Sequence, residues 1–338
     1  MNATLCSHQE FTLDGFPSFH KIRRLLFIPF FLIYMVILVT NGLIIHTVRM
    51  ESSLHAPMYV LISMLSAINI CGTTTIMPKM LLGFLFGLNR ISLTGCLVQM
   101  FFIYFIIMMD CNVLLMMALD RYIAVCKPLR YSHIMSNHRL LQLTIAAVIR
   151  SVSFVSPVIY LASIVHFCSS NTIRHFACEH MALLHLACGN ISRNKLAGLS
   201  LRVISIIFDM SFLSTSYGSI IRAALRISTG TLRHKALHTC GTHALVILIV
   251  YFFSLSSSIV YRVSGSVTPD THNLLSAIYL LIPALINPLI YGLRTNEIRC
   301  KILRTLGHRS PFTNQIRTIA AASKGGLGTS GGDPWPEG

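Results

Sequence analysis

The sequence predicts an all-α membrane protein, a bundle of seven transmembrane helices with the N-terminus outside and the C-terminus inside. Of the 338 residues, 54% are hydrophobic and only 11% are charged, and the mean hydropathy is +0.67. A water-soluble domain does not bury so large an apolar share. A helix needs about 20 apolar residues to cross a bilayer, and seven segments meet this requirement: 25–48, 58–80, 97–125, 140–165, 196–221, 238–260 and 273–293.

The seven segments follow one another, with the longest connection between the fourth and the fifth. The first begins near Leu25 and already has full span length, so we expect it to act as its own insertion signal without cleavage. The third contains Asp110, and the fourth and fifth contain Arg150 and Arg202 within their apolar runs. The seventh ends in Asn-Pro-Leu-Ile-Tyr, at 287–291.

The lysines and arginines set the orientation of these segments. An odd number of spans puts the two termini on opposite sides, and cytoplasmic loops carry the excess of Lys and Arg. More of the 27 Lys and Arg fall on the side of Arg121 than on the other, so we expect this side to be cytoplasmic. The formal net charge of +16 then reflects topology and contact with anionic membrane lipid. Nucleic acid is not expected as a partner, because the cations are spread over short loops.

Four regions follow from this pattern. Residues 1–24 form an extracellular N-terminus and 25–293 the seven-helix domain. Residues 294–306 form a basic amphipathic helix on the cytoplasmic leaflet, and 307–338 a cytoplasmic tail with the composition of disorder. Asn2 begins a glycosylation acceptor, Asn-Ala-Thr, which agrees with an N-terminus outside. We expect a multi-pass protein of the plasma membrane.

Four of the ten cysteines fall on the predicted outer side. Cys96 lies at the start of the third segment, and Cys168, Cys178 and Cys188 lie in the loop after the fourth. The extracellular space is oxidising, so these four side chains are expected to form two disulfides. The alternative is a metal site shared with neighbouring histidines, but the spacing fits no standard zinc pattern. We therefore expect no metal in this loop.

A charge pair stands at the inner end of the third segment, where Asp120, Arg121 and Tyr122 follow a long apolar run. An acid beside an arginine at this boundary can exchange protein partners when helices move. A transporter would show internal repeats, and an intramembrane enzyme a paired nucleophile and base or a metal cluster. Neither is found in the sequence, so the pattern indicates a signalling receptor and not an enzyme.

Several motifs together resemble the odorant receptors, a family of rhodopsin-like G-protein-coupled receptors. The resemblance covers roughly residues 11–306. Within the family, the chain most resembles the class I, or fish-like, subgroup, because it carries Cys178-Glu179-His180-Met181 and Asp209. The motifs that carry the resemblance to the whole family are Pro57-Met58-Tyr59, the run 117–122, Ser216-Tyr217, the run 235–240 with His243, and Asn287-Pro288 with Tyr291.

The resemblance implies a receptor for a small, often hydrophilic odorant that activates a stimulatory G protein and raises cyclic AMP. Trafficking helper proteins are further expected partners. Two alternatives stay open: a member of the same kind that senses a metabolite outside the nose, and a member that does not signal. The resemblance also implies that Cys96 pairs with Cys178, and Cys168 with Cys188.

In this family the ligand binds between the outer halves of spans three, five, six and seven. Helical spacing of three to four residues selects their inward faces. Ordinary packing is the alternative for each apolar position. The residues selected are Phe101, Tyr104, Met108, Leu201, Arg202, Ser205, Tyr251, Leu255, Ser258 and Arg262.

Arg262 ends the sixth span, where a guanidinium can hold a carboxylate by two parallel hydrogen bonds. A carboxylic acid is therefore one ligand hypothesis, and Arg202 offers a second cation. The alternative is that Arg262 reaches the lipid headgroups or pairs with Asp270 or Glu179.

The resemblance also implies a switch for G-protein coupling at the inner end and a buried polar site in the bundle. The family carries a carboxylate where this chain has Asn69, so beside Asp110 and Asn41 we expect at most a weak sodium site and no other cofactor. The family usually has an aromatic residue where this chain has Leu119. We nevertheless expect G-protein coupling to survive. The switch residues are Asp120, Arg121, Tyr122, Tyr217, His243, Asn287, Pro288 and Tyr291.

Overall fold

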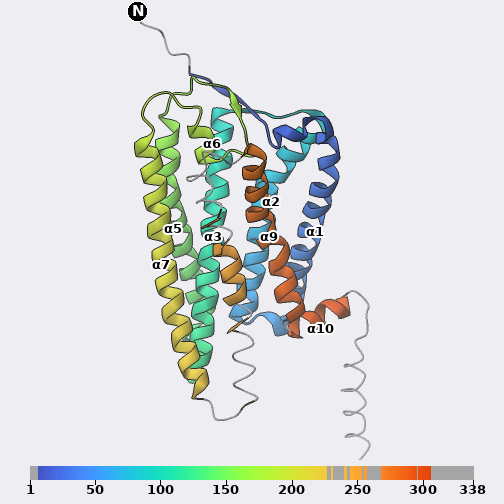
Figure 1. Cartoon of the computed structure of the whole chain (residues 1–338). Helices are drawn as coiled ribbons and strands as arrows, with labels where there is room; N and C mark the ends of the chain where they lie inside the picture. The colour runs from blue at the N-terminus through green and yellow to red at the C-terminus, as the bar shows by residue number, and fades with distance from the viewer. Residues whose placement is uncertain are drawn as a thin grey trace, which may run out of the picture.

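Long helices run side by side, with a small sheet at one end and a short helix leaving the bundle at the other (Figure 1). The computed structural model describes residues 7–226, 230, 240–241, 244–252, 255–256, 268–294 and 296–305. Asn2, His243, Ser258, Arg262 and the predicted tail 307–338 lie outside the described residues. The long helices are α1 (Arg23–Met50), α2 (Pro57–Phe86), α3 (Leu93–Cys126), α5 (Asn137–Ser163), α7 (Ser192–Leu225) and α9 (Pro269–Arg294).

Six helices of the described residues are long and apolar enough to cross a membrane. They coincide with six of the seven predicted segments, and the described residues within the remaining segment, 238–260, are helical as well. Several helices run past the predicted ends, because backbone hydrogen bonding does not stop where the apolar sequence ends. Six of the seven predicted spans are thus confirmed as long apolar helices.

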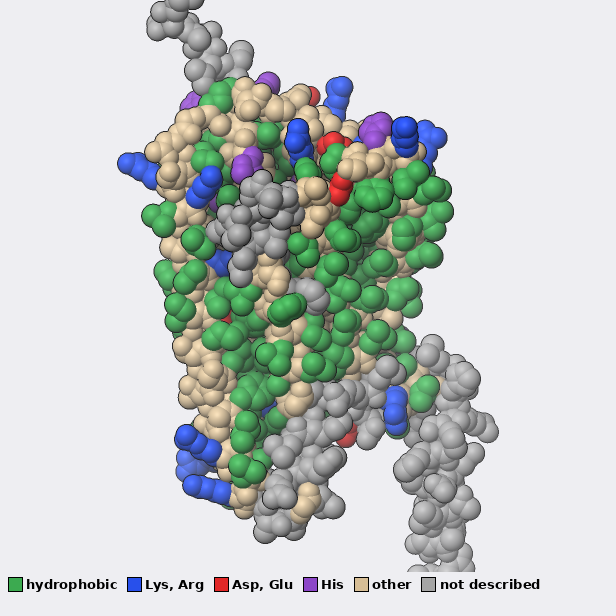
Figure 2. All heavy atoms as spheres, viewed as in Figure 1, with side chains coloured by type: hydrophobic (Ala, Val, Ile, Leu, Met, Phe, Trp, Pro, Cys, Tyr) green, Lys and Arg blue, Asp and Glu red, His purple; other side chains and the backbone are tan. Residues whose placement is uncertain are grey.

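The sides of the bundle present apolar side chains. Figure 2 shows hydrophobic side chains over the middle of the molecule, with Lys and Arg gathered toward its two ends. Leu25 on α1, Ile149 on α5 and Ile207 on α7 are each about 60% exposed. In water such surface would be unfavourable, but in a bilayer lipid tails cover it.

A three-stranded sheet covers the end of the bundle that carries the N-terminus, which we call the outer end (Figure 1). Its strands are β1 (Glu10–Leu13), β2 (Arg90–Ser92) and β3 (Thr172–Ile173), with β1 in the middle. β1 is antiparallel to β2, with Phe11 opposite Ile91, and parallel to β3, with Thr12 opposite Thr172. The all-α prediction did not include this sheet, because strands this short show no periodicity in the sequence.

The loop between α5 and α7 is held down at several points. Disulfides join Cys96 to Cys178 and Cys168 to Cys188, the pairing that the family resemblance implies. The backbone N–H of Phe176 donates to the side chain of Asn273 on α9, at 2.9 Å. The loop therefore forms a fixed cover over the space between the helices.

At the opposite, inner end, α10 (Asn296–Thr305) leaves the bundle at an angle to α9 (Figure 1). It occupies the region predicted as an amphipathic helix. Ile298 is fully buried against the bundle, and Lys301 forms an ion pair with Glu51 after α1. The short α4 (Tyr131–Ile134) follows α3 at the same end.

Candidate functional site

A cavity lies in the outer half of the bundle, beneath the disulfide-held loop. The volume of the cavity is about 170 Å³. Apolar side chains from α3, α5 and α7 form its walls, among them Ile107, Val158 and Leu201. Polar side chains lie at the loop above and around Asp209 and Tyr251 below. Such an apolar chamber with a few polar groups is typical of small-molecule sites.

Six of the residues predicted to bind ligand line this cavity. They are Tyr104, Met108, Leu201, Arg202, Ser205 and Tyr251.

Phe101, which we expected at the ligand site, does not line this cavity. Its ring stacks on Phe105, with ring centroids 5.9 Å apart, and it does not line the cavity. The loop contacts α3 at Cys96 and at Gln99, whose side chain accepts from the N–H of Cys178 at 3.0 Å. On α3 the cavity lining begins at Ile103 and Tyr104, below these contacts.

Leu255, also expected at the ligand site, lies outside the lining of this cavity. Its side chain is 39% exposed and is not among the cavity residues. Helical spacing puts it on the same face as Leu248 and Phe252, which are 67% and 65% exposed. Ser258 and Arg262 lie outside the described residues.

The cavity also contains residues that the sequence analysis did not assign to a ligand site. Glu179 and His180 come from the loop, which has no periodicity from which to infer a face. Phe154 and Val158 come from α5 and Tyr279 from α9, two helices for which no ligand residue was named. The Cys178-Glu179-His180-Met181 motif is the sequence signal from which these loop residues could have been named as ligand-site candidates.

Glu179 forms the roof of the cavity. Its Oε1 accepts from the Tyr104 hydroxyl at 3.1 Å, and its Oε2 caps α6 (His180–Leu184) by accepting from the N–H of Ala182 at 2.8 Å. Burial raises the pKa of Glu179, whereas these hydrogen bonds and the positive charge of Arg202 act in the opposite direction. The loop is thus tied to α3 through a carboxylate and not only through a disulfide.

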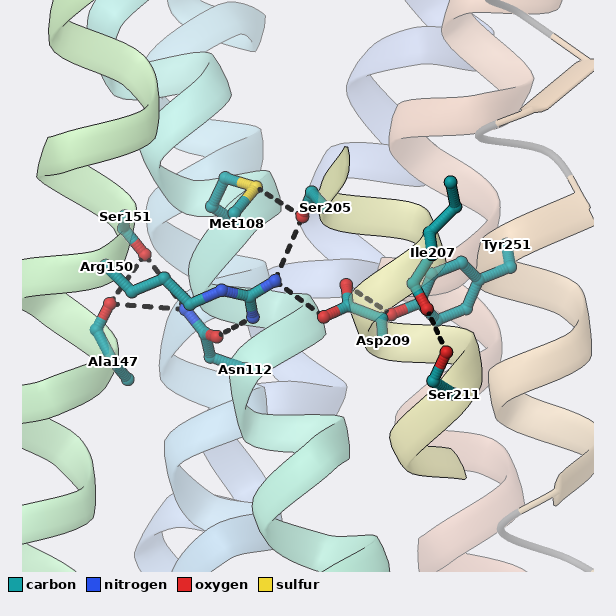
Figure 3. Close-up of polar contacts among 10 residues, drawn as sticks. All are labelled: Met108, Asn112, Ala147, Arg150, Ser151, Ser205, Ile207, Asp209, Ser211 and Tyr251. Carbon is teal, nitrogen blue, oxygen red and sulfur yellow. Dashed lines mark hydrogen bonds and ion pairs between the residues drawn. The ribbon is translucent and has the colours of Figure 1, made fainter. Parts of the chain in front are cut away.

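Arg150 organises the floor of the cavity. It reaches from α5 toward α7, and Figure 3 shows Arg150, Asp209 and Tyr251 following one another in a row. Its Nη2 donates to Asp209 Oδ1 at 2.6 Å and to Ser205 Oγ at 3.0 Å. Its Nη1 donates to Asn112 Oδ1 on α3 at 2.5 Å. A charge inside a membrane helix is costly unless it is paired, and here the pairing joins three helices.

The sixth segment joins the same network through Tyr251. The Tyr251 hydroxyl donates to Asp209 Oδ2 at 2.8 Å, so both carboxylate oxygens are engaged. Asn112 in turn donates to Ser151 Oγ at 3.0 Å. The floor of the cavity is therefore a continuous set of hydrogen bonds across α3, α5, α7 and the sixth segment.

The predicted switch residues lie toward the inner end. Arg121 Nη2 is 3.2 Å from Asp120 Oδ2, and Asp120 Oδ1 accepts from the Tyr131 hydroxyl of α4 at 2.7 Å. Tyr291 of α9 belongs to the same buried apolar cluster as Met117 and Ala118 of α3, and Tyr217 of α7 packs against this cluster. The structure thus brings α7 and α9 to the part of α3 that carries Asp120 and Arg121.

The other switch residues are spread around this point. Lys127 lies over the ring of Tyr122, 6.0 Å from its centroid. Asn287 is buried and Pro288 lies within α9. His243 lies outside the described residues.

The predicted buried polar site joins α1, α2 and α9. Asn69 Nδ2 donates to Asn41 Oδ1 at 3.0 Å, and Asn41 Nδ2 donates to the carbonyl oxygen of Ala284, also at 3.0 Å. Asp110 lines a smaller cavity together with Asn69 and Thr73. Within the described part of the chain, no three His, Cys, Asp or Glu side chains are grouped to hold a metal ion.

Comparison with known proteins shows the family. The sequence profile of the olfactory receptor family matches residues 30–309. Human olfactory receptor 52K2 is 37% identical over 302 residues, which cover 89% of this chain and 96% of the relative. Human olfactory receptor 52B6 is 40% identical over 287 residues, 85% of each chain. Human olfactory receptor 51E2 is 37% identical over 303 residues, 90% of this chain and 95% of the relative.

The fold is that of a rhodopsin-like receptor. The crystal structure of squid rhodopsin superposes with a TM-score of 0.67 and 16% identity, covering 85% of this chain and 86% of the other. Together with the helices and the cavity, these similarities identify the chain as a member of the olfactory receptor family of G-protein-coupled receptors, a multi-pass plasma-membrane protein that is not an enzyme.

Proposed function

We propose that this receptor binds a small odorant in the cavity beneath the loop and activates a stimulatory G protein that raises cyclic AMP. The contact between Tyr251 and Asp209 is the observation that supports this most, because it joins the floor of the cavity to the sixth segment. A ligand that alters this contact favours one arrangement of the sixth segment over another. The inner end around Arg121, predicted to be cytoplasmic, then meets the G protein.

A wall residue provides the test. Val158→Phe places a larger side chain inside the cavity, whereas Ile149→Phe makes the same kind of change on the exposed face of the same helix, where Ile149 is 60% exposed. Cyclic AMP is measured in cells that display each receptor, with trafficking helper proteins co-expressed and surface display verified. We expect odorant potency to fall at least about tenfold in Val158→Phe, an effect of 1.4 kcal/mol, and to be unchanged in Ile149→Phe. Equal responses of the two variants would contradict the assignment of the cavity.

We also propose that sodium affects this receptor weakly. Asn69 supplies an amide beside Asp110 where a second carboxylate would strengthen cation binding, and its amide nitrogen is bonded to Asn41. Replacing sodium chloride by choline chloride should change odorant potency less than about threefold, roughly 0.7 kcal/mol. A larger shift that disappears in Asp110→Asn would contradict this.

A further inference from the structure

A second glycosylation acceptor lies in the loop just before α7. Asn190, Ile191 and Ser192 form an Asn-X-Ser sequence without proline in the middle. Asn190 and Ser192 are both exposed, and the chain turns just before them at Gly189, whose φ is 91°. Such sequences also occur by chance, so the case for a glycan depends on where this one lies in the fold.

The loop carries the marks of the compartment in which glycans are attached. Cys188, two residues before Asn190, forms a disulfide with Cys168. Disulfides form in the oxidising lumen of the secretory pathway, and N-linked glycans belong to surface loops of secreted chains. β3 of the same loop pairs with β1 of the N-terminal segment at the outer end (Figure 1). These observations favour a lumenal position for Asn190.

The turn that carries Asn190 is fixed on both sides and lies away from the ligand cavity. The disulfide of Cys188 holds it before Asn190. After it, the side chain of Asn194 donates to the carbonyl oxygen of Leu161 on α5, at 2.6 Å. None of the described residues 189–193 lines the cavity. A glycan on this turn would extend into solvent and would not displace the cover of the cavity.

Helix α7 lifts the turn above the membrane. Its 34 residues span about 51 Å, about 20 Å more than the hydrocarbon core of a bilayer. Its first turn exposes Arg193 and Lys195, side chains that reach toward the headgroups, and the apolar face begins at Leu196, which is 67% exposed. Asn190 comes before the first residue of the helix, so it lies on the water side of the headgroups.

The Asn190 side chain has its oxygen in use and its nitrogen available. Oδ1 accepts from the N–H of Ser192, the first residue of α7, at 2.8 Å. Nδ2 makes no hydrogen bond to the part of the chain that the structure describes. The first N–H groups of a helix lack partners within the helix, so capping α7 is the alternative role of Asn190. An aspartate would accept the same bond, but it could not carry a glycan.

We propose that Asn190 carries an N-linked glycan. In this reaction Nδ2 attacks the first sugar of a lipid-linked oligosaccharide diphosphate, which is the co-reactant. A C–N bond forms while the bond between sugar and phosphate breaks, Nδ2 loses one proton, and the lipid diphosphate leaves. Oδ1 takes no part, so its hydrogen bond to Ser192 is kept. The modification is independent of the odorant and of the G protein.

Four substitutions separate the glycan from the helix cap. Asn190→Asp removes the acceptor nitrogen and keeps the oxygen that caps α7. Ser192→Ala keeps Asn190 but destroys the acceptor sequence, and Ser192→Thr preserves that sequence and is the matched control. Asn2→Gln removes the first acceptor and is the background for the other three, so that the second site is read alone.

The full chain is produced in mammalian cells, and its gel mobility is compared before and after an amidase that releases N-linked glycans. In Asn2→Gln we expect one mobility step that the amidase removes. The step should be lost when Asn190→Asp or Ser192→Ala is added and should stay with Ser192→Thr. Release converts the modified asparagine to aspartate, so peptide mass spectrometry should find this conversion at position 190 in the unchanged receptor. Attachment precedes export, so the step does not depend on surface display.

Three results would overturn the proposal. If Asn2→Gln alone removes the whole mobility step, the outer end is lumenal but Asn190 only caps α7. If the step persists when Asn190→Asp is added to Asn2→Gln, the glycan is attached elsewhere. If neither the unchanged receptor nor any variant responds to the amidase, the predicted orientation of the N-terminus fails together with the proposal.

Discussion

Arg150→Met removes the guanidinium that pairs with Asp209 while keeping an unbranched apolar side chain. The side chain of Asp209 is only 2% exposed, so water cannot replace the lost partner. The substitution also removes the donors to Asn112 and Ser205. Among the described residues, the hydrogen bond from Tyr251, at 2.8 Å, is the one that stays at Asp209.

Removing one partner of a buried ion pair costs about 3–5 kcal/mol, because the other charge is left buried without compensation. For a chain of this size each kcal/mol lowers the thermal midpoint by about 2 °C, so we expect Arg150→Met to lower it by about 6–10 °C. Arg150→Met combined with Asp209→Asn removes both charges. The double variant should therefore be more stable than Arg150→Met alone by at least about 1.5 kcal/mol.

The assay is thermal unfolding of the purified receptor in detergent, followed by a thiol-reactive fluorophore that reports exposure of the buried Cys111. Arg139→Met, at an exposed arginine of the same helix, is the control and should change stability by less than about 0.5 kcal/mol. If the double variant is less stable than Arg150→Met by the full cost of Asp209→Asn, the two residues are not coupled and the reasoning fails.

Three further outcomes are expected in the same assay. Gly15→Ala should lower the stability by about 1–3 kcal/mol, because the added Cβ would lie 2.6 Å from the Cβ of Phe176. Gly42→Ala is the control, since a Cβ there meets nothing within 4 Å. An equal loss of stability in both variants would contradict the steric argument. Burial lowers the pKa of His175 to about 4. Between about pH 6.5 and pH 4 the unfolded state therefore binds a proton that the folded state does not bind. The folded receptor should lose about 2 kcal/mol of stability at pH 5 for this reason. His175→Asn should remove that loss, and an unchanged pH dependence would refute the assignment. Lys301→Met breaks a partly exposed ion pair at α10 and should cost less than about 1 kcal/mol, so a larger loss would show that α10 contributes more than this pair.

Several features could be predicted from the sequence because each depends on a short, continuous stretch of the chain. A bilayer requires an apolar run of a given length, so the helical spans could be read directly from the chain. The disulfide pairing and the family came from short motifs, such as those around Cys178 and Arg121. Helical spacing also selected residues such as Tyr104 and Tyr251, which line the cavity.

Helical spacing did not select cavity residues where the answer depended on neighbouring elements. Phe101 stacks on Phe105 and does not line the cavity, and nothing in the spacing of α3 shows where a loop from another part of the chain will lie. Leu255 shares a face with exposed residues, which is settled only by how the sixth segment is rotated against its neighbours.

The sequence by itself determined the helices, the family and the predicted orientation, because a membrane imposes length and polarity along the chain. Only the tertiary structure decided which charges meet. Arg150 and Asp209 lie 59 residues apart, and Tyr104 and Glu179 lie 75 residues apart. Contacts at such separations depend on helix packing and on the path of the loop, and these set both the floor and the roof of the ligand cavity.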